Sequence, residues 1–397
     1  MLHRLSLSLR TILLLWFSGL YLRLMLLVTA PLGPRMAEDL GLSATVMGML
    51  TTLPVLMLAS GAIAGAWVVA RLGVRTTLIF ALLLAVAGSI ARAGTDGALT
   101  LLLATAVMGL GIAAMQTSLP SLVRQWTPGR VALATAIYMN GLLMGEVLAA
   151  GLTLPLVLPL TGDSWRLTLM VWSLPGLLVA AALYGMGAPT SRLPRAEQQR
   201  HHWLPDFRQP VVWAMGLVVG MSSTLFFGLN AYMANVLQDR GEGHLLASGL
   251  LLFNSAQVVA SFLALRYAGR WLGQTSPLLT LTLVSIGGTL LFGFGSGWWA
   301  LWAAFATSLC VGIVLILMVS LPAAMAVADR TAPLAAGMFT IGYALSFGVP
   351  LLSGTLVDHT GVANWALAPL LAVALLAVPA CAVVGHQYRL ARYRTEV

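Results

Sequence analysis

Arg23 is a charged residue inside an apolar stretch that is long enough to cross a membrane. It follows Thr11, near the start of that stretch, by twelve residues. At a rise of about 1.5 Å per residue, its side chain lies about 18 Å into the bilayer. An arginine at that depth costs about 2.5 to 3.5 kcal/mol and needs water or a partner. Because its planar fork suits carboxylate-like groups, we expect Arg23 to attract a small anion.

Glu146 is the only acid well inside an apolar stretch, in the segment NGLLMGEVLAAG. Apolar surroundings disfavour a charged carboxylate, so Glu146 is a candidate proton-coupling site. Two other interpretations remain open, a neutral carboxyl hydrogen-bonded within the bundle and an ion pair with Arg23. Gly141, Gly145 and Ala149 recur every four residues beside it and predict a strip of small residues for helix packing.

Further polar side chains at membrane depth can hydrogen-bond a solute, although such groups more often join helices to one another. Arg92 lies near the outer end of its stretch, and we expect its side chain to extend towards the lipid headgroups. With Arg23, the candidate solute-binding residues are Gln116, Asn230, Tyr232, Asn254, Gln257 and Tyr343.

No motif indicates another kind of chemistry. GMGAP, from Gly185 to Pro189, is not a phosphate-binding loop, and Cys310 and Cys381 have no partner at metal-ligand spacing. We therefore expect no enzyme activity, no catalytic residues, no cofactor and no metal. Without a nucleotide site, any transport would be driven by gradients.

The composition predicts the elements that position these residues. Of 397 residues, 59% are apolar and 8% are charged, and the mean hydropathy is +0.92. A soluble domain has about 25% charged residues, which excludes a water-soluble enzyme. We predict an all-α polytopic membrane protein with twelve transmembrane helices. The predicted spans are residues 11–37, 44–70, 76–93, 98–123, 132–158, 167–186, 211–237, 245–267, 278–294, 298–327, 334–357 and 363–385.

The arginines predict the orientation. All 21 basic residues are arginine, and an orientation with both termini in the cytoplasm places sixteen of them on the inner side. The absence of lysine is typical of a GC-rich bacterial coding bias and favours the inner (cytoplasmic) membrane. The polar segment 188–210 divides the chain almost in half, so we predict a six-helix half at 1–187, a cytoplasmic linker, and a six-helix half at 211–397.

Five strings spread over most of the chain carry a family resemblance. They are GLYLRLMLLVTAPLGPRMAEDLGLS from Gly19, GLGIAAMQTSLPSLVR from Gly109, WRLTLMVWSLPG from Trp165, VLQDRG from Val236 and IGYALSFGVPLLSGTLVDHTGVANW from Ile341. Together these strings resemble the cyanate and 2-nitroimidazole permease family of major facilitator transporters. The resemblance implies the major facilitator fold and cavity roles for Arg23, Gln116, Tyr232 and Tyr343. The sequence differs from the usual pattern at Ala70, where the superfamily has an acid before Arg-x-Gly-Arg, and at Tyr232, where the family often has Trp-Leu-Pro.

The leading hypothesis is a secondary active transporter that moves a small anion or anion-like polar solute by alternating access. The alternative is a proton-coupled exporter of drugs or metabolites, favoured by Glu146 and by the Met-rich spans. A membrane receptor is a weaker hypothesis, because the sequence has no sizeable soluble domain to signal or bind. A channel is a further, less favoured hypothesis. We expect a monomer whose partners are a small anionic solute, protons and lipid, with no nucleic acid.

Overall fold

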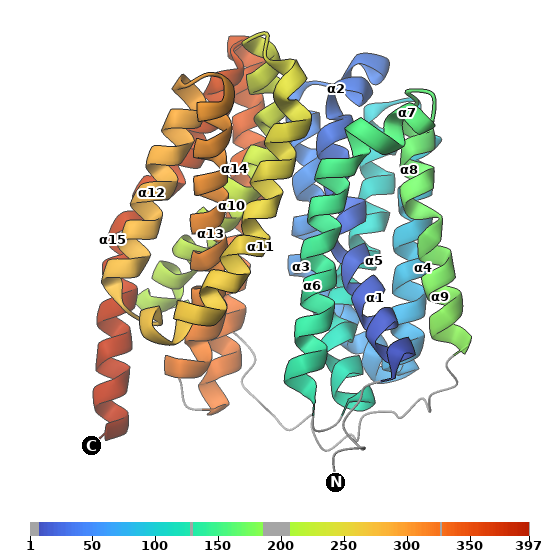
Figure 1. Cartoon of the computed structure of the whole chain (residues 1–397). Helices are drawn as coiled ribbons and strands as arrows, with labels where there is room; N and C mark the ends of the chain where they lie inside the picture. The colour runs from blue at the N-terminus through green and yellow to red at the C-terminus, as the bar shows by residue number, and fades with distance from the viewer. Residues whose placement is uncertain (1–7, 128–129, 186–206, 326–327, 397) are drawn as a thin grey trace. The chain divides into compact units, whose positions relative to one another are not determined.

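The computed structural model describes residues 8–127, 130–185, 207–325 and 328–396, and within them every regular element is helical. Among the described residues, eleven helical segments are long and apolar enough to cross a membrane, and the apolar segment Ala44–Leu58 is shorter. The predicted all-α membrane fold is confirmed. Within each part of the chain the long helices run side by side (Figure 1).

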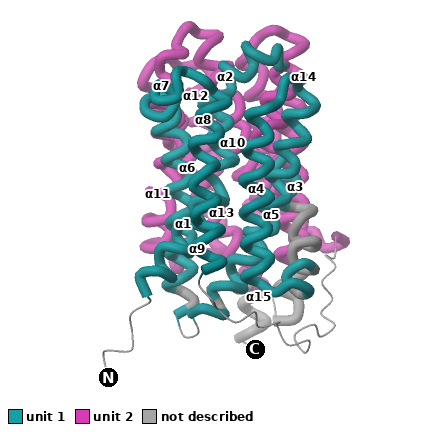
Figure 2. Tube along the Cα trace, turned by 90° about the vertical axis from the view of Figure 1, so that its right-hand side faces the viewer, with its two compact units in different colours: residues 1–42, 53–197 teal, residues 43–52, 198–397 magenta. Residues whose placement is uncertain are grey.

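The chain forms two compact units (Figure 2). Unit 1 contains residues 1–42 and 53–197, and unit 2 contains residues 43–52 and 198–397. One helix therefore starts in unit 2 and continues in unit 1 from Leu53. Residues 188–206 of the predicted linker 188–210 lie outside the described residues, as do residues 1–7.

Unit 1 is built from the first predicted spans. Helices α4 and α5 pack together, as do α1 and α6. The elements are α1 (Leu9–Leu27), α2 (Thr29–Leu40), α3 (Ala44–Leu72), α4 (Val74–Ala93), α5 (Ala98–Trp126), α6 (Val131–Leu152), the π-helix η1 (Thr153–Val157), α7 (Leu158–Leu160), α8 (Trp165–Ser173) and α9 (Pro175–Gly185).

Prolines divide two of the predicted spans. The first span is two helices that meet at Val28, and Pro31 in the first turn of α2 has no N–H to donate to the carbonyl of Leu27. The sixth span is likewise α8 and α9, which starts at Pro175. These breaks expose backbone groups inside the unit, where side chains can bind them.

Unit 2 is organised around α10, which packs against α13, α14 and α15, while α13 also packs against α11 and α12. Most residues of α10 are buried, so it forms the core of the unit. The elements are α10 (Pro210–Asp239), the 3₁₀ helix η3 (Gly243–Leu245), α11 (Leu246–Trp271), α12 (Thr275–Phe294), α13 (Gly297–Met325), α14 (Ala328–Thr360), the 3₁₀ helix η4 (Ala363–Ala366) and α15 (Leu367–Glu396).

Candidate functional site

Two glycines allow the backbones of α1 and α6 to touch. A Cβ atom added to Gly141 would collide with the carbonyl group of Trp16, and one added to Gly145 would collide with that of Leu20. The predicted strip of small residues is thus confirmed at both positions. Close backbone approach through small residues is a common way for membrane helices to pack. It brings the next turn of each helix, with Arg23 and Glu146, within reach of each other.

Arg23 and Glu146 form an ion pair inside unit 1. Arg23 Nε lies 3.4 Å from Glu146 Oε1, and the two side chains are 17% and 4% exposed. Of the interpretations considered for Glu146, the pairing with Arg23 is the one the structure contains. The arginine is the more exposed partner, so it has the better access to a solute.

The pair leaves acceptor capacity on the carboxylate. Glu146 Oε2 is buried and has no hydrogen-bond partner among the described residues. A carboxylate has about four lone-pair sites, and leaving them unfilled in a buried position is costly. Glu146 is therefore a group at which binding a proton would relieve an unfavourable state.

Arg92 does not extend to the headgroups, so that expectation is wrong. Its side chain is fully buried and donates to Thr29 Oγ1 at 2.9 Å, to the carbonyl of Met25 at 3.0 Å and to Ser89 Oγ at 2.8 Å. All three acceptors are neutral. Met25 and Thr29 flank the break between α1 and α2, so Arg92 stabilises that break from α4.

In unit 2 the structure brings Asn230 and Asn254 together. Asn254 Nδ2 donates to Asn230 Oδ1 at 2.9 Å, and Asn230 Nδ2 donates to the carbonyl of Phe226 at 3.0 Å. Both side chains are buried, and Asn254 Oδ1 has no donor among the described residues. That oxygen is an unfilled acceptor in the apolar interior of the unit.

The other candidate residues of unit 2 have separate contacts. Gln257 Nε2 donates to the carbonyl and the hydroxyl of Ser308, at 2.8 and 3.0 Å. Tyr343 is half-buried and stacks on Phe339 with ring centroids 5.6 Å apart. Tyr232 is fully buried, and its hydroxyl donates to the carbonyl of Pro350 at 2.6 Å. The contacts of Gln257 and Tyr232 join helices within the unit, whereas Tyr343 and Phe339 both lie on α14.

The remaining candidate, Gln116, is half-buried in α5 of unit 1. It is not part of the Arg23–Glu146 ion pair. The roles of all the candidate residues in solute binding stay predictions.

Sequence reasoning did not identify Asp358, although it lies in one of the family-like strings. This exposed acid at the end of α14 accepts the backbone N–H groups of Ala44 and Thr45 at 2.7 and 2.9 Å. The only available signal was an acid near the end of a predicted span. It could not indicate a partner more than three hundred residues away in the chain.

Two other family-like strings contribute arginines that bind helix ends. Arg166 forms an ion pair with Asp39 and donates to the carbonyl of Thr95 at 3.1 Å. Arg240 donates to the carbonyls of Phe292 and Gly295 at the C-terminal end of α12, at 2.8 and 2.7 Å. A cation is favourable at this end of a helix dipole. Burial lowers the pKa of Arg240, and its acidic neighbours oppose that shift.

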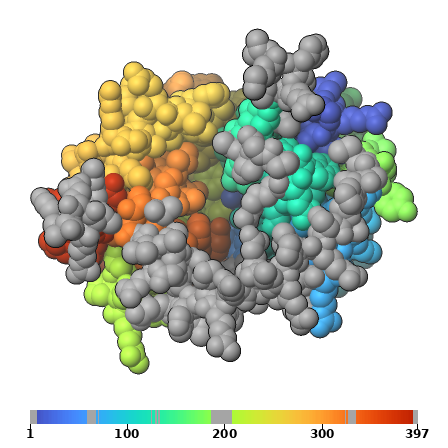
Figure 3. Space-filling model, turned by 90° about the horizontal axis from the view of Figure 1, so that it is seen from below, coloured from blue at the N-terminus to red at the C-terminus, as the bar shows by residue number. Residues whose placement is uncertain are grey.

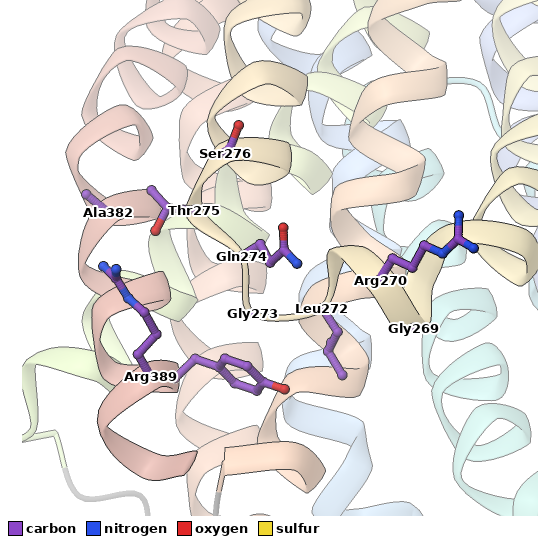
Figure 4. A pocket seen from close by; sticks show the side chains of 10 residues that line it. Gly269, Arg270, Leu272, Gly273, Gln274, Thr275, Ser276, Ala382 and Arg389 are labelled. Atoms are coloured by element: carbon purple, nitrogen blue, oxygen red, sulfur yellow. The ribbon is translucent and has the colours of Figure 1, made fainter. Parts of the chain in front are cut away.

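A surface hollow of about 730 Å³ lies in unit 2, where the α11–α12 turn meets α15 (Figure 4). Arg270 and Arg389 are exposed and stand at opposite ends of it, so they do not converge on one point. Gly273, with φ +71°, packs against the ring of Tyr388. Figure 3 shows the molecule from below, where gold atoms of α11 and α12 and red atoms of α15 are visible. None of the predicted solute-binding residues lines the hollow.

Comparison with known proteins identifies transporters among the relatives. The 2-nitroimidazole transporter of Escherichia coli (strain K12) is 30% identical over 377 residues, which cover 88% of each chain. The cyanate transport protein CynX of the same organism is 25% identical over 379 residues, covering 92% of this chain and 95% of the relative. The resemblance found from the sequence strings is confirmed.

Solved structures share the fold. A bacterial homolog of the human lysosomal transporter Spinster, in an inward-facing and occupied conformation, superposes with a TM-score of 0.74 at 16% identity over 96% of each chain. A D-xylose-proton symporter gives a TM-score of 0.74 at 16% identity over 96% of this chain and 97% of its own. These likenesses support the predicted twelve-helix major facilitator fold. The two named relatives from Escherichia coli are transporters and not enzymes. Residues 15–349 match the family profile, and the chain belongs to the Major Facilitator Superfamily.

Proposed function

We propose that this transporter moves a small anionic or anion-like polar solute, of the cyanate or nitroimidazole class, by alternating access. The buried Arg23–Glu146 pair carries the proposal, because it places a guanidinium beside a carboxylate whose charge a proton can remove. The names of the two Escherichia coli relatives support the solute class. We further propose that protons are the coupling ion.

In this mechanism the solute and Glu146 compete for Arg23. An ionised Glu146 neutralises the guanidinium, so a solute anion gains little by approaching it. A proton on Glu146 removes that counter-charge, and the anion can then take the place of the carboxylate at Arg23. When Glu146 loses its proton, it displaces the anion again. Solute and proton therefore bind and leave together.

Uptake into liposomes tests the proposal with labelled cyanate and 2-nitroimidazole as probes. A charge-assisted hydrogen bond contributes about 1.5 to 3 kcal/mol, so Arg23→Gln should weaken cyanate binding about ten- to a hundredfold. Arg23→Lys keeps the charge without the fork and should show a partial defect. Arg35→Gln is the matched control, because Arg35 pairs with Asp163 at 3.2 Å but both side chains are exposed.

Glu146→Gln tests the coupling separately. The variant should exchange solute across the membrane but should not accumulate it under a pH gradient. Accumulation equal to that of the parent protein would show that Glu146 has only a structural role. If the folded Arg23→Gln variant binds cyanate with near-normal affinity, Arg23 is not the anion-binding residue.

The second candidate is a proton-coupled exporter of drug-like or metabolite compounds. The same ion pair favours this candidate. If Glu146 neutralised Arg23 permanently, the site would carry no net charge and would suit apolar, drug-like compounds better than an anion. A thermal-shift screen of the purified protein against small anions and cationic drugs separates the two, because a ligand that binds the folded state raises its stability.

We also propose the topology that the arginine distribution predicts, with both termini and the linker 188–210 on the cytoplasmic side of the inner membrane. The halves 1–187 and 211–397 would be the two bodies that move during transport. The protein would act as a monomer.

A further inference from the structure

The first turn of α3 donates hydrogen bonds to an acid on a helix that is distant in the sequence. Asp358, on α14, accepts the N–H groups of Ala44 and Thr45 through different carboxylate oxygens, at 2.7 and 2.9 Å, and the Thr45 hydroxyl at 2.5 Å. Free N–H groups at a helix start favour a negative charge, and such charge-assisted bonds are stronger than neutral ones. Asp358 thus supplies part of the N-terminal cap of α3.

Tyr232, on α10, adds a second attachment. Its ring packs in a small buried cluster with Ala44, Ala231 and Ala366. Its hydroxyl donates to the carbonyl of Pro350 and lies 3.4 Å from that of Ala44. It therefore joins α10 to both α14 and the start of α3.

Two glycines make this contact close. A Cβ atom on Gly48 of α3 would collide with the hydroxyl of Tyr232, and one on Gly354 of α14 would collide with the backbone of Thr45. Residues 43–52 consequently belong to unit 2, whereas α3 from Leu53 onward belongs to unit 1. A single helix is thus attached at its start to one compact unit and continues into the other.

The start of α3 can leave Asp358 without losing its helical structure. Ser43 Oγ already accepts the N–H of Val46 at 3.3 Å, and the Ser43 carbonyl accepts the N–H of Met47 at 3.0 Å. Asp358 accepts the N–H groups of Ala44 and Thr45 and the hydroxyl of Thr45. Because Asp358 is exposed, water can replace these bonds on both sides.

We propose that Asp358 and Tyr232 form a releasable latch for residues 43–52 of α3, which opens and closes once in each transport cycle. A rearrangement of unit 1 against unit 2 pulls on a helix anchored in both. The hydrogen bonds of the latch can break and re-form, because their polar groups can exchange protein partners for water, whereas the buried packing of Tyr232 against Ala44 favours the closed state. This inference does not depend on the solute or on Glu146.

Cysteine labelling tests the latch in intact cells. Single cysteines are placed at Ala44 and Met47, which are both buried in the latched segment, after Cys310 and Cys381 are replaced by alanine. A membrane-impermeant maleimide then reports how often the segment is released. Asp358→Ala should speed the labelling of both cysteines by at least about tenfold, because it removes three hydrogen bonds to a charged acceptor. Thr45→Val, which removes only the hydroxyl, should give a smaller increase.

Two controls make the result decisive. A cysteine at Ala363, equally buried but in η4, reports general loosening of unit 2. Asp163→Asn removes an exposed acid elsewhere and should change no rate. Unchanged labelling at Ala44 and Met47 in both Asp358→Ala and Thr45→Val overturns the latch. So does acceleration at Ala44 alone, which indicates fraying of one turn, or equal acceleration at Ala363. If Asp358→Ala does not fold, Asp358→Asn and Thr45→Val decide the question.

Discussion

The Arg23–Glu146 pair should show strong energetic coupling in a double-mutant cycle. Breaking a buried ion pair at one partner typically costs about 3 to 5 kcal/mol, because the remaining charge is left uncompensated. Glu146 is 4% exposed, so Arg23→Gln should cost about 3 kcal/mol. Arg23 is 17% exposed and partly hydrated, so Glu146→Gln should cost less, about 1 to 2 kcal/mol.

The double variant removes both charges and leaves neither uncompensated. We expect it to be no less stable than Arg23→Gln, which corresponds to a coupling energy of about 1 to 2 kcal/mol or more. The assay is reversible unfolding of the purified protein in mixed micelles, with the free energy of unfolding measured for the parent, both single variants and the double variant.

The exposed ion pair of Arg35 and Asp163 provides a control double-mutant cycle. Its charged atoms are 3.2 Å apart, close to the distance in the buried pair, but its side chains are 42% and 70% exposed. Exposed ion pairs contribute about 0 to 1 kcal/mol. Additive effects of Arg23→Gln and Glu146→Gln, or a coupling no larger than that of the exposed pair, would refute the reasoning from burial.

Three further predictions concern packing, hydrogen bonding and topology. Gly145→Ala should destabilise the protein by about 1 to 3 kcal/mol, because its Cβ meets the backbone of α1, whereas Gly287→Ala, with open space around it, should be neutral or stabilising in the same unfolding assay. Arg92→Met should lower the free energy of unfolding by about 2 to 4 kcal/mol through the loss of three hydrogen bonds, and Arg92→Lys should recover part of it. A cysteine at His202 should react with an impermeant maleimide only in inverted vesicles, and reaction in intact cells would reverse the proposed orientation.

The sequence predicts the number and type of helices well because membrane insertion depends on hydropathy, which is a local property. It predicts helix breaks less well. The run through Val28 is continuously apolar, and the division into α1 and α2 depends on Pro31 and on support from Arg92.

The sequence is less informative about partners, because these depend on which helix faces meet. The sequence indicates the depth of Arg92 in the membrane, and depth alone predicts a side chain that extends to the lipid headgroups. The sequence does not show that α4 packs where acceptors on α1 and α2 face Arg92. The Arg23–Glu146 pair was among the alternatives because so few charges lie inside the spans. Asp358 had no such signal.

The division of α3 between the two units determines which fragments of the protein keep a complete buried core. A fragment of residues 198–397 contains most of unit 2 but lacks residues 43–52, which cover Tyr232 and bind Asp358. Such a fragment would expose Tyr232 and its neighbours Ala231 and Ala366, which are buried in the full chain. We expect it to aggregate when expressed alone, and a synthetic peptide of residues 43–52 added in trans should have a ready binding site on it.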